Sequence, residues 1–352
     1  MRKIAFFVLL TALILLLLSC GERKDAVTSQ PGYEIVATIP PIGIFRHIFI
    51  DEVNSRGFLA ADYMGVLVLD LSNPASPSII DTLKNDLIDG GVGSTYYSDS
   101  TDIIYIEIIP SATGVGKHIR GFKLTDFDPS SYPLFTRGSP PVEKFMVREF
   151  NRDSLGITLT DSIHLYIADT DEIEKLDRTT MFRLDSTYTF LRNASYNLQK
   201  VYDFDIQDSY AYIAINELGM AILNLESNYI LPVVGSFDSE GFCRGIEVQG
   251  DYCYMADRSW GLQVLDISNP AAPLRIANLL FPGSQDFIKV RVLNDRAVAL
   301  DQYDGIFAVD ISNPADPRLM FSFDTVTPTD VAITADYIYV VDEDAGLIIA
   351  SW

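Results

Sequence analysis

From residue 33 to the C-terminus, the chain consists of short runs in which apolar and polar residues alternate. Gly245-Ile-Glu-Val-Gln249 is followed by a Gly-Asp turn, then by Tyr252-Cys-Tyr-Met-Ala256, and two further runs follow at residues 262–267 and 274–279. Runs of this length, rich in β-branched and aromatic residues and bounded by Gly, Asn, Asp and Pro, are typical of β-strands. No helical periodicity of useful length follows residue 20. The pattern therefore predicts an all-β fold.

This four-strand unit recurs along the chain. Three segments are nearly identical, namely 65–77 (GVLVLDLSNPASP), 261–273 (GLQVLDISNPAAP) and 305–317 (GIFAVDISNPADP). Weaker copies lie at residues 121–126, 172–177, 219–224 and 346–351. The third strands of these units are expected to end at residues 70, 126, 177, 224, 266, 310 and 351, which are 41 to 56 residues apart. Propeller blades have such a period, so we expect seven blades.

The two ends of the chain predict how the ring closes. The seventh unit, residues 329–352, has only three strands, whereas residues 33–40 have no unit of their own and resemble an outer strand. Pairing of this N-terminal strand with the last blade would remove both exposed edges. We therefore expect residues 33–352 to form a single β-propeller of seven four-stranded blades, closed by an N-terminal strand.

The Gly-Leu-x-Val-x-Asp strand and the Asp-Ile-Ser-Asn-Pro turn resemble the LVIVD repeat family. The resemblance is strong in units one, five and six, moderate in two, four and seven, and weak in three. It implies a β-propeller of the kind found in exported and surface proteins, and it brings no general set of catalytic residues. The signatures of WD40 and kelch repeats are not found.

The N-terminus predicts export and a lipid anchor. Residues 1–19 combine the basic pair Arg2-Lys3 with an apolar run, as signal peptides do. Leu17-Leu18-Ser19-Cys20 resembles the lipobox of bacterial lipoproteins, which implies cleavage before Cys20 and lipid attachment to its thiol. Residues 20–32 are polar and form a flexible tether. We expect a protein held in the bacterial envelope, at the outer membrane or the cell surface.

Charge narrows the choice of partner. The net charge is −22, and removal of residues 1–19 leaves 24 of the 26 Lys and Arg against 48 Asp and Glu. Nucleic-acid binding needs a basic surface, so nucleic acid is excluded as a partner. We interpret the acidity as a solubility feature first and as a means of attracting cations or basic partners second. The chain is expected to be a monomer.

Candidate chemistry is sparse. The three histidines, His47, His118 and His164, do not have a metal-ligand spacing. The acidic stretches at residues 169–172 and 342–344 lack the ligand series of a calcium loop. No Gly-x-Ser-x-Gly, phosphate loop or Cys-His pair is present. We assign no catalytic residue, no metal site and no cofactor.

The remaining cysteines, Cys243 and Cys253, are expected to be free although the chain is exported. The turn at residues 249–251 places Cys253 opposite Glu247, four residues from Cys243 along the inner strand. Four residues of strand span roughly 13 Å, whereas a disulfide needs Cα atoms within about 7 Å.

One face of the ring collects the loops between second and third strands. An aspartate ends the second-strand motif in five units, at Asp62, Asp169, Asp257, Asp301 and Asp342. We favour a role in capping the tight turn of each unit over a negative funnel that binds a ligand. Further acids in these loops make the face acidic in either case, namely Asp171, Glu172, Asp304, Glu343 and Asp344. Trp260, with Tyr63 and Tyr303 at similar places, offers a stacking surface for a sugar or peptide, and packing between blades is the favoured alternative.

The inner strands line the central channel, and Arg46, Arg244 and Lys289 lie near their starts. These side chains are candidates for binding an anion, although pairing with neighbouring aspartates is favoured. His47, beside Arg46, is a candidate acid or base, and a structural role is favoured for it.

The leading hypothesis is a non-enzymatic binding or scaffold module for a protein or glycan. The alternative is a propeller enzyme, a glycan lyase or hydrolase that acts on an extracellular polymer. A third hypothesis is that the protein has a purely structural role in the envelope. Two carboxylates roughly 5–10 Å apart in an apolar cleft would favour the enzyme.

Overall fold

The computed structural model describes residues 32–84, 90–99, 102–110, 118–125, 135–138, 142–150, 162–169, 172–177, 194–197, 201–226, 231–281 and 286–352. Between residues 126 and 200, the description covers strand backbones alone. The predictions for residues 1–31, including Cys20, lie outside these ranges, and so do Asp126 and Asp171. Within the described ranges, no helix is long and apolar enough to cross a membrane.

The described strands form seven four-stranded sheets, which we call blades 1 to 7. Blade 1 contains β2 (His47–Asp51), β3 (Arg56–Ala60), β4 (Val66–Asp70) and β5 (Ser78–Leu83). Blade 2 contains β6 (Gly90–Ser98), β7 (Ile103–Pro110), β8 (His118–Lys123) and β9 (Phe135–Gly138). Blade 3 contains β10 (Val142–Phe150), β11 (Ser162–Asp169), β12 (Glu172–Asp177) and β13 (Ala194–Asn197).

The second half of the ring has the same composition. Blade 4 contains β14 (Asp203–Gln207), β15 (Tyr210–Ala214), β16 (Met220–Asn224) and β17 (Val233–Phe237). Blade 5 contains β18 (Gly245–Gln249), β19 (Tyr252–Ala256), β20 (Leu262–Asp266) and β21 (Leu274–Leu279). Blade 6 contains β22 (Phe287–Leu293), β23 (Arg296–Asp301), β24 (Gly305–Asp310) and β25 (Arg318–Phe323). Blade 7 contains β26 (Pro328–Ile333), β27 (Tyr337–Asp342), β28 (Gly346–Ser351) and the N-terminal β1 (Glu34–Ile39).

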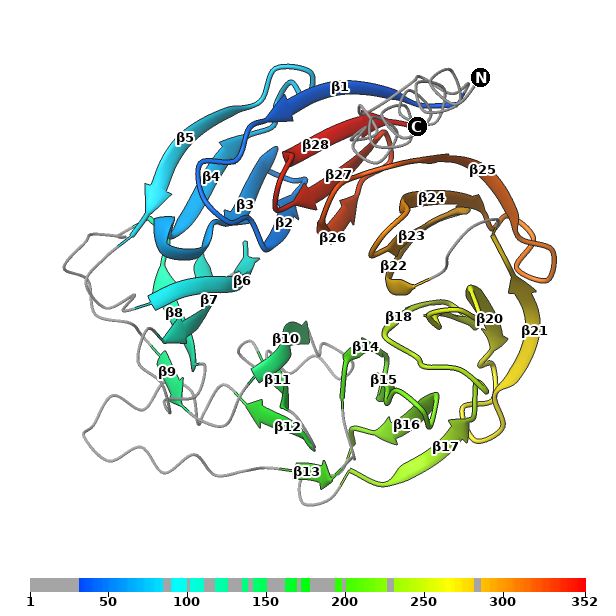
Figure 1. Ribbon diagram of the computed structural model, residues 1–352. Helices are drawn as coiled ribbons and strands as arrows, with labels where there is room; N and C mark the ends of the chain where they lie inside the picture. The colour runs from blue at the N-terminus through cyan, green and yellow to red at the C-terminus, as the bar shows by residue number, and fades with distance from the viewer. Residues whose placement is uncertain are drawn as a thin grey trace, which may run out of the picture.

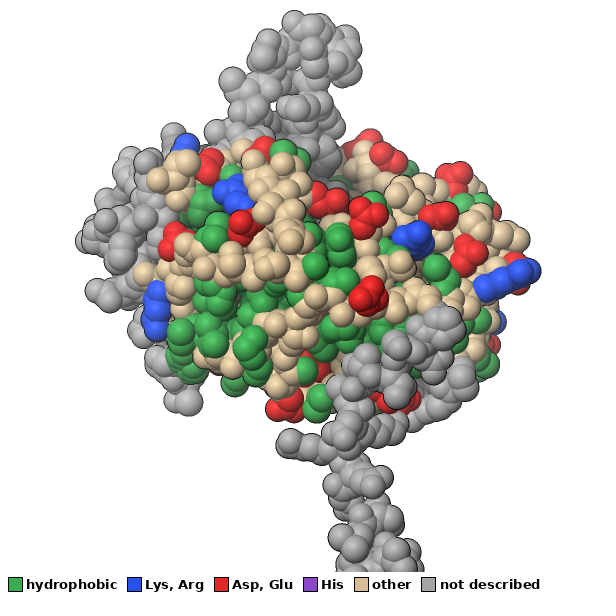
Figure 2. Space-filling model, turned by 90° about the horizontal axis from the view of Figure 1, so that it is seen from above, with side chains coloured by type: hydrophobic (Ala, Val, Ile, Leu, Met, Phe, Trp, Pro, Cys, Tyr) green, Lys and Arg blue, Asp and Glu red, His purple; other side chains and the backbone are tan. Residues whose placement is uncertain are grey.

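The sheets stand around a common centre, with the first strand of each blade innermost and the last strand on the rim (Figure 1). The all-β propeller predicted from the repeats is therefore confirmed. Figure 2 shows the ring edge-on, with acidic side chains near its two faces and hydrophobic side chains in the band between the faces.

The predicted closure of the ring is also confirmed. β1 pairs antiparallel with β28, from Glu34 opposite Ser351 to Ile39 opposite Leu347. Just before β1, the ring of Tyr33 stacks on Phe321 and Phe323 of blade 6, at centroid distances of 5.1 and 4.8 Å. The N-terminal segment therefore completes blade 7 and also seals its boundary with blade 6.

The repeat motif predicts the third strands well because its glycine has a local backbone role. The motif glycines have positive φ angles, as at Gly261 (77°) and Gly346 (92°). A Cβ added at Gly346 would lie 2.1 Å from the carbonyl oxygen of Ile39. Only glycine fits such a left-handed turn against a neighbouring strand.

Blade 2 departs from the predicted frame. In blade 1, the N–H of Leu71, the residue after Asp70, donates to Ser55 O. In blade 2, the N–H of Leu124 makes the same contact with Asp102 O. Lys123 therefore occupies the position of Asp70, and Asp126 does not. Gly121 pairs with Tyr105 inside β8 and does not form the turn. The assignment of residues 121–126 was wrong by three residues, because a glycine within a strand was read as the motif glycine.

The two cysteines are buried and free, as predicted. The predicted register was wrong by one residue, because the turn holds only Gly250 and Asp251 and places Cys253 opposite Val248. Cys243 lies before β18, and its backbone forms an isolated antiparallel β-bridge with the backbone of Asn216 in blade 4.

Candidate functional site

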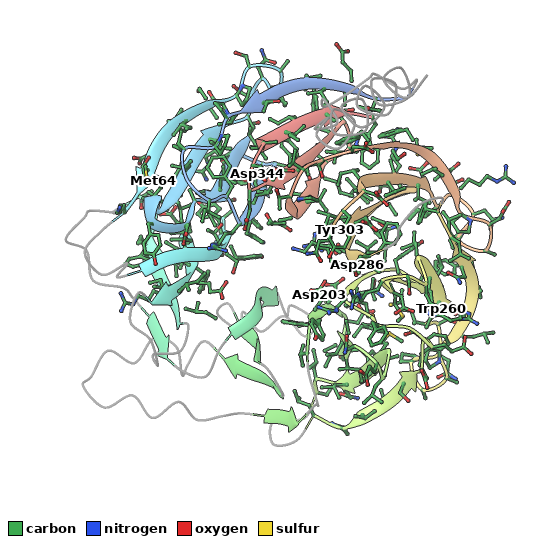
Figure 3. The ribbon with its side chains drawn as sticks, viewed as in Figure 1. Met64, Asp203, Trp260, Asp286, Tyr303 and Asp344 are labelled. Carbon is green, nitrogen blue, oxygen red and sulfur yellow. The ribbon has the colours of Figure 1, made fainter. Side chains whose placement is uncertain are left out.

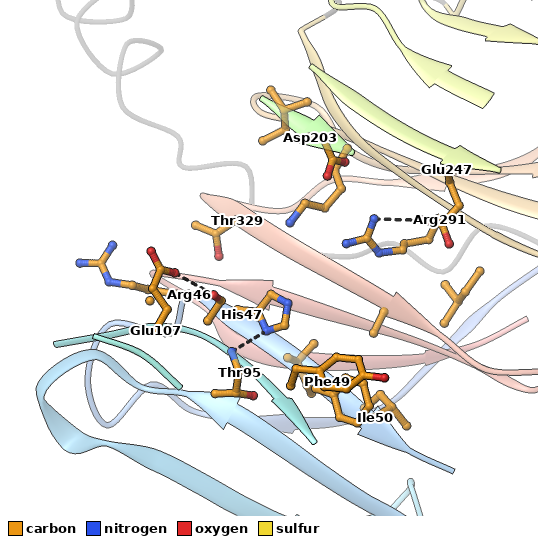
Figure 4. A pocket seen from close by; sticks show the side chains of 18 of the residues that line it. Arg46, His47, Phe49, Ile50, Thr95, Glu107, Asp203, Glu247, Arg291 and Thr329 are labelled. Carbon is orange, nitrogen blue, oxygen red and sulfur yellow. Dashed lines mark hydrogen bonds and ion pairs between the residues drawn. The ribbon is translucent and has the colours of Figure 1, made fainter. Parts of the chain in front are cut away.

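A cavity of about 630 Å³ lies among the first strands at the centre of the ring. Arg46, His47, Arg244 and Lys289 all line it, together with side chains from β6, β14 and β26. Figure 4 shows Asp203, Glu247 and Arg291 on one side of the cavity and Arg46, His47, Thr95 and Glu107 on the other. We call this cavity the channel.

Asp330 on β26 organises the charges on one side of the channel. Its Oδ1 accepts a hydrogen bond from Lys289 Nζ at 2.5 Å and lies 3.8 Å from Arg291 Nη2. Its Oδ2 accepts the backbone N–H of Ile48 at 3.0 Å and lies 3.7 Å from His47 Nε2. The side chain is only 1% exposed. One carboxylate therefore joins blade 7 to both of its neighbours.

Asp330 is ionised in the folded protein. Burial by itself would raise its pKa, but Lys289, His47 and Arg291 outweigh this effect and hold the pKa well below its usual range. A carboxylate in this state accepts hydrogen bonds and does not supply a proton near neutral pH.

Other channel carboxylates make the same kind of contact between blades. Asp203 accepts the backbone N–H of Ile246 at 3.2 Å, and Asp205 accepts that of Val248 at 2.9 Å. First strands are edge strands, so their outward N–H groups need acceptors that their own sheet does not supply. These aspartates of blade 4 supply them for blade 5.

His47 has a related structural role. Its Nδ1 accepts the backbone N–H of Thr95 in blade 2 at 3.4 Å, while Nε2 faces Asp330. Contacts to blades 2 and 7 support the structural interpretation favoured from the sequence over an acid or base role.

The three predicted channel cations differ in their partners. Arg46 Nη2 lies 3.3 Å from Asp62 Oδ2, and Lys289 binds Asp330. Arg244 has no such partner among the described residues, and its guanidinium carbon lies 4.0 Å from the centroid of the Tyr202 ring. Pairing with aspartate is therefore correct for Arg46 and Lys289 and wrong for Arg244.

Two of the turn aspartates, Asp301 and Asp342, are buried and cap their turns as expected. Asp342 Oδ1 accepts the N–H groups of Asp344 and Ala345 at 2.9 and 2.7 Å. Asp301 Oδ1 accepts those of Tyr303 and Asp304 at 2.8 and 2.9 Å. The other oxygen of each carboxylate binds N–H groups of the loop before the first strand. The two loop types therefore meet on one face, which we call the loop face.

Asp62 and Asp257 differ from this pattern. In blade 5, the N–H of Asp257 donates to the carbonyl oxygen of the motif glycine, Gly261. In blade 1, Ala61 makes this contact with Gly65, so Ala61 occupies the position of the turn aspartate and Asp62 is the next residue. Grouping Asp62 with the other turn aspartates was therefore wrong by one residue. Asp257 is fully buried and accepts a hydrogen bond from Gln263, and burial raises its pKa to about 6. Asp169 ends β11 within the part of the chain described by backbone alone.

The turn aromatics are exposed. Tyr63, Trp260 and Tyr303 are 60%, 39% and 63% exposed, so the expectation that they pack between blades was wrong. Arg258, which pairs with Asp286, lies 5.7 Å from the Phe242 ring centroid in the same region. Figure 3 shows Met64, Trp260 and Tyr303 at separate positions around the ring.

These aromatics belong to a larger apolar set. Of the 17 large hydrophobic side chains that are exposed in the described ranges, ten lie in loops of the loop face. They are Ile42, Ile44, Tyr63, Met64, Leu218, Phe242, Trp260, Leu280, Tyr303 and Val326. More than half of the large exposed hydrophobic side chains of the described ranges therefore lie on the loop face.

Sequence reasoning missed Asp330, Arg291, Glu247 and Tyr202. A signal for Arg291 was present in the first strand of blade 6, where Lys289-Val-Arg291 places charges two residues apart, as Asp203-Phe-Asp205 does in blade 4. Side chains two apart share a face of a strand, so such pairs indicate a charged channel.

Comparison with known proteins agrees with this architecture. The LVIVD repeat family matches residues 59–84, 240–279, 298–325 and 328–350, which fall in blades 1, 5, 6 and 7. No curated protein sequence matches the chain.

Several solved structures share the fold. The WD40 β-propeller domain of Doa1 has a TM-score of 0.64 and 11% identity, over 92% of this chain and 98% of that chain. U3-55K has a TM-score of 0.63 and 9% identity, over 91% and 98%. The computationally designed Ika8 protein has a TM-score of 0.61 and 8% identity, over 91% and 100%. At these identities, the likeness shows the fold alone.

Proposed function

We propose that this chain is an envelope lipoprotein whose propeller binds a protein partner through the loop face and catalyses no reaction. The observation that carries the proposal is the concentration of exposed apolar side chains on that face, ten of the 17 in the described ranges. Trp, Tyr and Arg are the residues that contribute most binding energy at protein interfaces. Trp260, Tyr303 and Arg258 supply all three types in neighbouring loops of blades 5 and 6.

The charge of the surface favours a partner that carries basic groups. Exposed acids lie among the apolar side chains, such as Glu240 and Glu343, whose side chains are 61% and 37% exposed. With a net charge of −22 for the chain, encounters with a basic surface are accelerated at low salt. A protein partner with aliphatic or aromatic anchors and a basic rim fits this surface.

The contacts within the channel favour binding over catalysis. The carboxylates of Asp203, Asp205 and Asp330 accept backbone N–H groups of neighbouring blades. Glu247 pairs with Arg291 at 3.2 Å. Carboxylates held in this way are ill suited to give and take protons, as a glycan hydrolase would require.

The envelope location rests on residues 1–20. A lipidated Cys20 would hold the ring at the outer membrane or cell surface, with residues 21–32 as the tether. We expect Cys20→Ala to remain unprocessed or to leave the membrane fraction after signal cleavage. Cell fractionation and detergent phase partitioning measure this, and a cleaved variant that still partitions with detergent would contradict the anchor.

The binding proposal is tested with full-length protein, purified in detergent and immobilised, against an envelope extract. We expect the double variant Trp260→Ala/Tyr303→Ala to lose capture of the partner that the unchanged protein retains. The matched control is Ile80→Ala/Leu319→Ala, which removes exposed apolar side chains from the outer strands β5 and β25. Equal capture by both double variants would overturn the assignment of the loop face.

A further inference from the structure

Arg244 differs from the other cations of the channel. Arg46 pairs with Asp62, Lys289 with Asp330 and Arg291 with Glu247. Arg244 is the channel-lining Arg or Lys for which the described residues provide no ion pair. The Arg244 side chain is partly exposed at the channel, so an anion that enters the channel can supply the counter-charge that the described residues do not.

The geometry around Arg244 is that of a preformed site. Tyr202 and Arg244 occupy the same position in adjacent blades, because their N–H groups donate to Ala214 O and Ala256 O at 3.0 and 2.9 Å. Stacking on the Tyr202 ring fixes the plane of the guanidinium. The Arg244 Nε is buried and has no hydrogen-bond partner among the described residues. A buried donor in this state costs free energy until an acceptor arrives.

The cavity also indicates what kind of anion it takes. A guanidinium presents a planar fork of donors that matches the two oxygens of a carboxylate or phosphate. The described lining of the channel contains six Asp and Glu against four Lys and Arg. This excess of negative charge favours a singly charged anion over a doubly charged one. Ile288 of blade 6, whose carbonyl group lies beside Gly245, adds an apolar wall.

We infer that the channel binds an organic monocarboxylate, whose carboxylate pairs with Arg244 and whose apolar body lies along the channel wall. A volume of about 630 Å³ is within the range of small-molecule sites. This site rests on the unpaired arginine and not on the loop-face apolar set, so it stands whether or not a protein partner docks there.

The test uses full-length protein in detergent and isothermal titration calorimetry at pH 7 and constant ionic strength. Butyrate is the probe, and acetate, succinate and inorganic phosphate are the comparisons. We expect one butyrate per chain, bound more tightly than acetate because of the apolar wall. Succinate and phosphate should bind more weakly because of their second charge.

Three variants complete the test. Arg244→Gln should weaken butyrate binding about tenfold or more, since it removes a charge-assisted pair, and Arg244→Lys should recover part of the loss. Arg296→Gln is the matched control, because Arg296 also stacks on an aromatic ring, Trp352 at 4.9 Å, but does not line the channel. Absence of butyrate binding to the unchanged protein, unaltered binding to Arg244→Gln, or phosphate binding as tight as butyrate would each overturn the inference.

Discussion

Replacement of Asp330 by alanine should destabilise the whole ring. The carboxylate accepts the Ile48 N–H of blade 1 at 3.0 Å and the Lys289 ammonium of blade 6 at 2.5 Å while only 1% exposed. Loss of one member of a buried ion pair typically costs ~3–5 kcal/mol, because the other charge is left without a partner. We expect a loss of about 4 kcal/mol in the free energy of unfolding, a large share of the ~5–15 kcal/mol of an ordinary domain.

The assay is urea denaturation followed by circular dichroism. The loss should shrink by at least about 1 kcal/mol when Asp330→Ala is made together with Lys289→Met, since the two side chains interact directly. Asp316→Ala, which breaks an exposed pair with Arg318, is the control and should leave the midpoint unchanged. If Asp330→Ala also leaves the midpoint unchanged, or if its cost is the same with Lys289→Met, the inter-blade role of this carboxylate is wrong.

The same carboxylate predicts a pH dependence. Its pKa in the folded protein lies below the ordinary value of 3.8, despite burial, because Lys289, His47 and Arg291 favour the charged form. A folded pKa below the unfolded one contributes stability that is present above the unfolded pKa and is lost as pH falls toward the folded value. The difference in stability between the unchanged protein and Asp330→Asn should therefore shrink as the pH falls below about 3.8.

Three further predictions concern the rest of the ring. Deletion of residues 33–40 should lower the melting temperature by roughly 10 °C, because it exposes the edge of β28 and removes the Tyr33 stack; an unchanged melting temperature would refute the closure. Alkylation after unfolding without reductant should label both Cys243 and Cys253, and a linked 243–253 peptide in mass spectrometry would contradict the free thiols. Gly346→Ala should destabilise the fold far more than Gly250→Ala, because a Cβ at Gly250 meets nothing within 4 Å. For Gly250→Ala, a loss of ~1–2 kcal/mol in the free energy of unfolding is expected from the left-handed φ alone. Equal shifts of the melting temperature would contradict the close approach of Ile39 to Gly346.

The fold could be predicted from the sequence because its signals are local. The motif glycine, the strand that follows it and the Asn-Pro turn all lie within about a dozen residues, and their recurrence reveals the blades. The prediction went wrong in blade 2, where Gly121 lies inside a strand and only the pairing with Tyr105 shows the correct frame.

The site was harder to predict because its contacts join blades. Asp330 binds Lys289, 41 residues away, and Ile48, 282 residues away. No local pattern specifies such pairs, so the sequence placed Arg46, Arg244 and Lys289 in the channel without separating the paired cations from the unpaired one. The exposure of Tyr63 and Tyr303 could likewise not be predicted from the sequence, because it depends on how far each loop projects above the ring.

Site-specific photo-crosslinking in living cells tests the central claim most directly. A photoreactive amino acid is placed on the loop face, at Tyr63, Trp260 or Tyr303, and elsewhere on the ring, at Val53, Ile80 or Leu319, all of which are exposed. We predict one protein adduct of constant mass from the loop-face positions and none from the other three. Adducts that come equally from both sets, or only from the second set, would contradict the loop face as the docking surface.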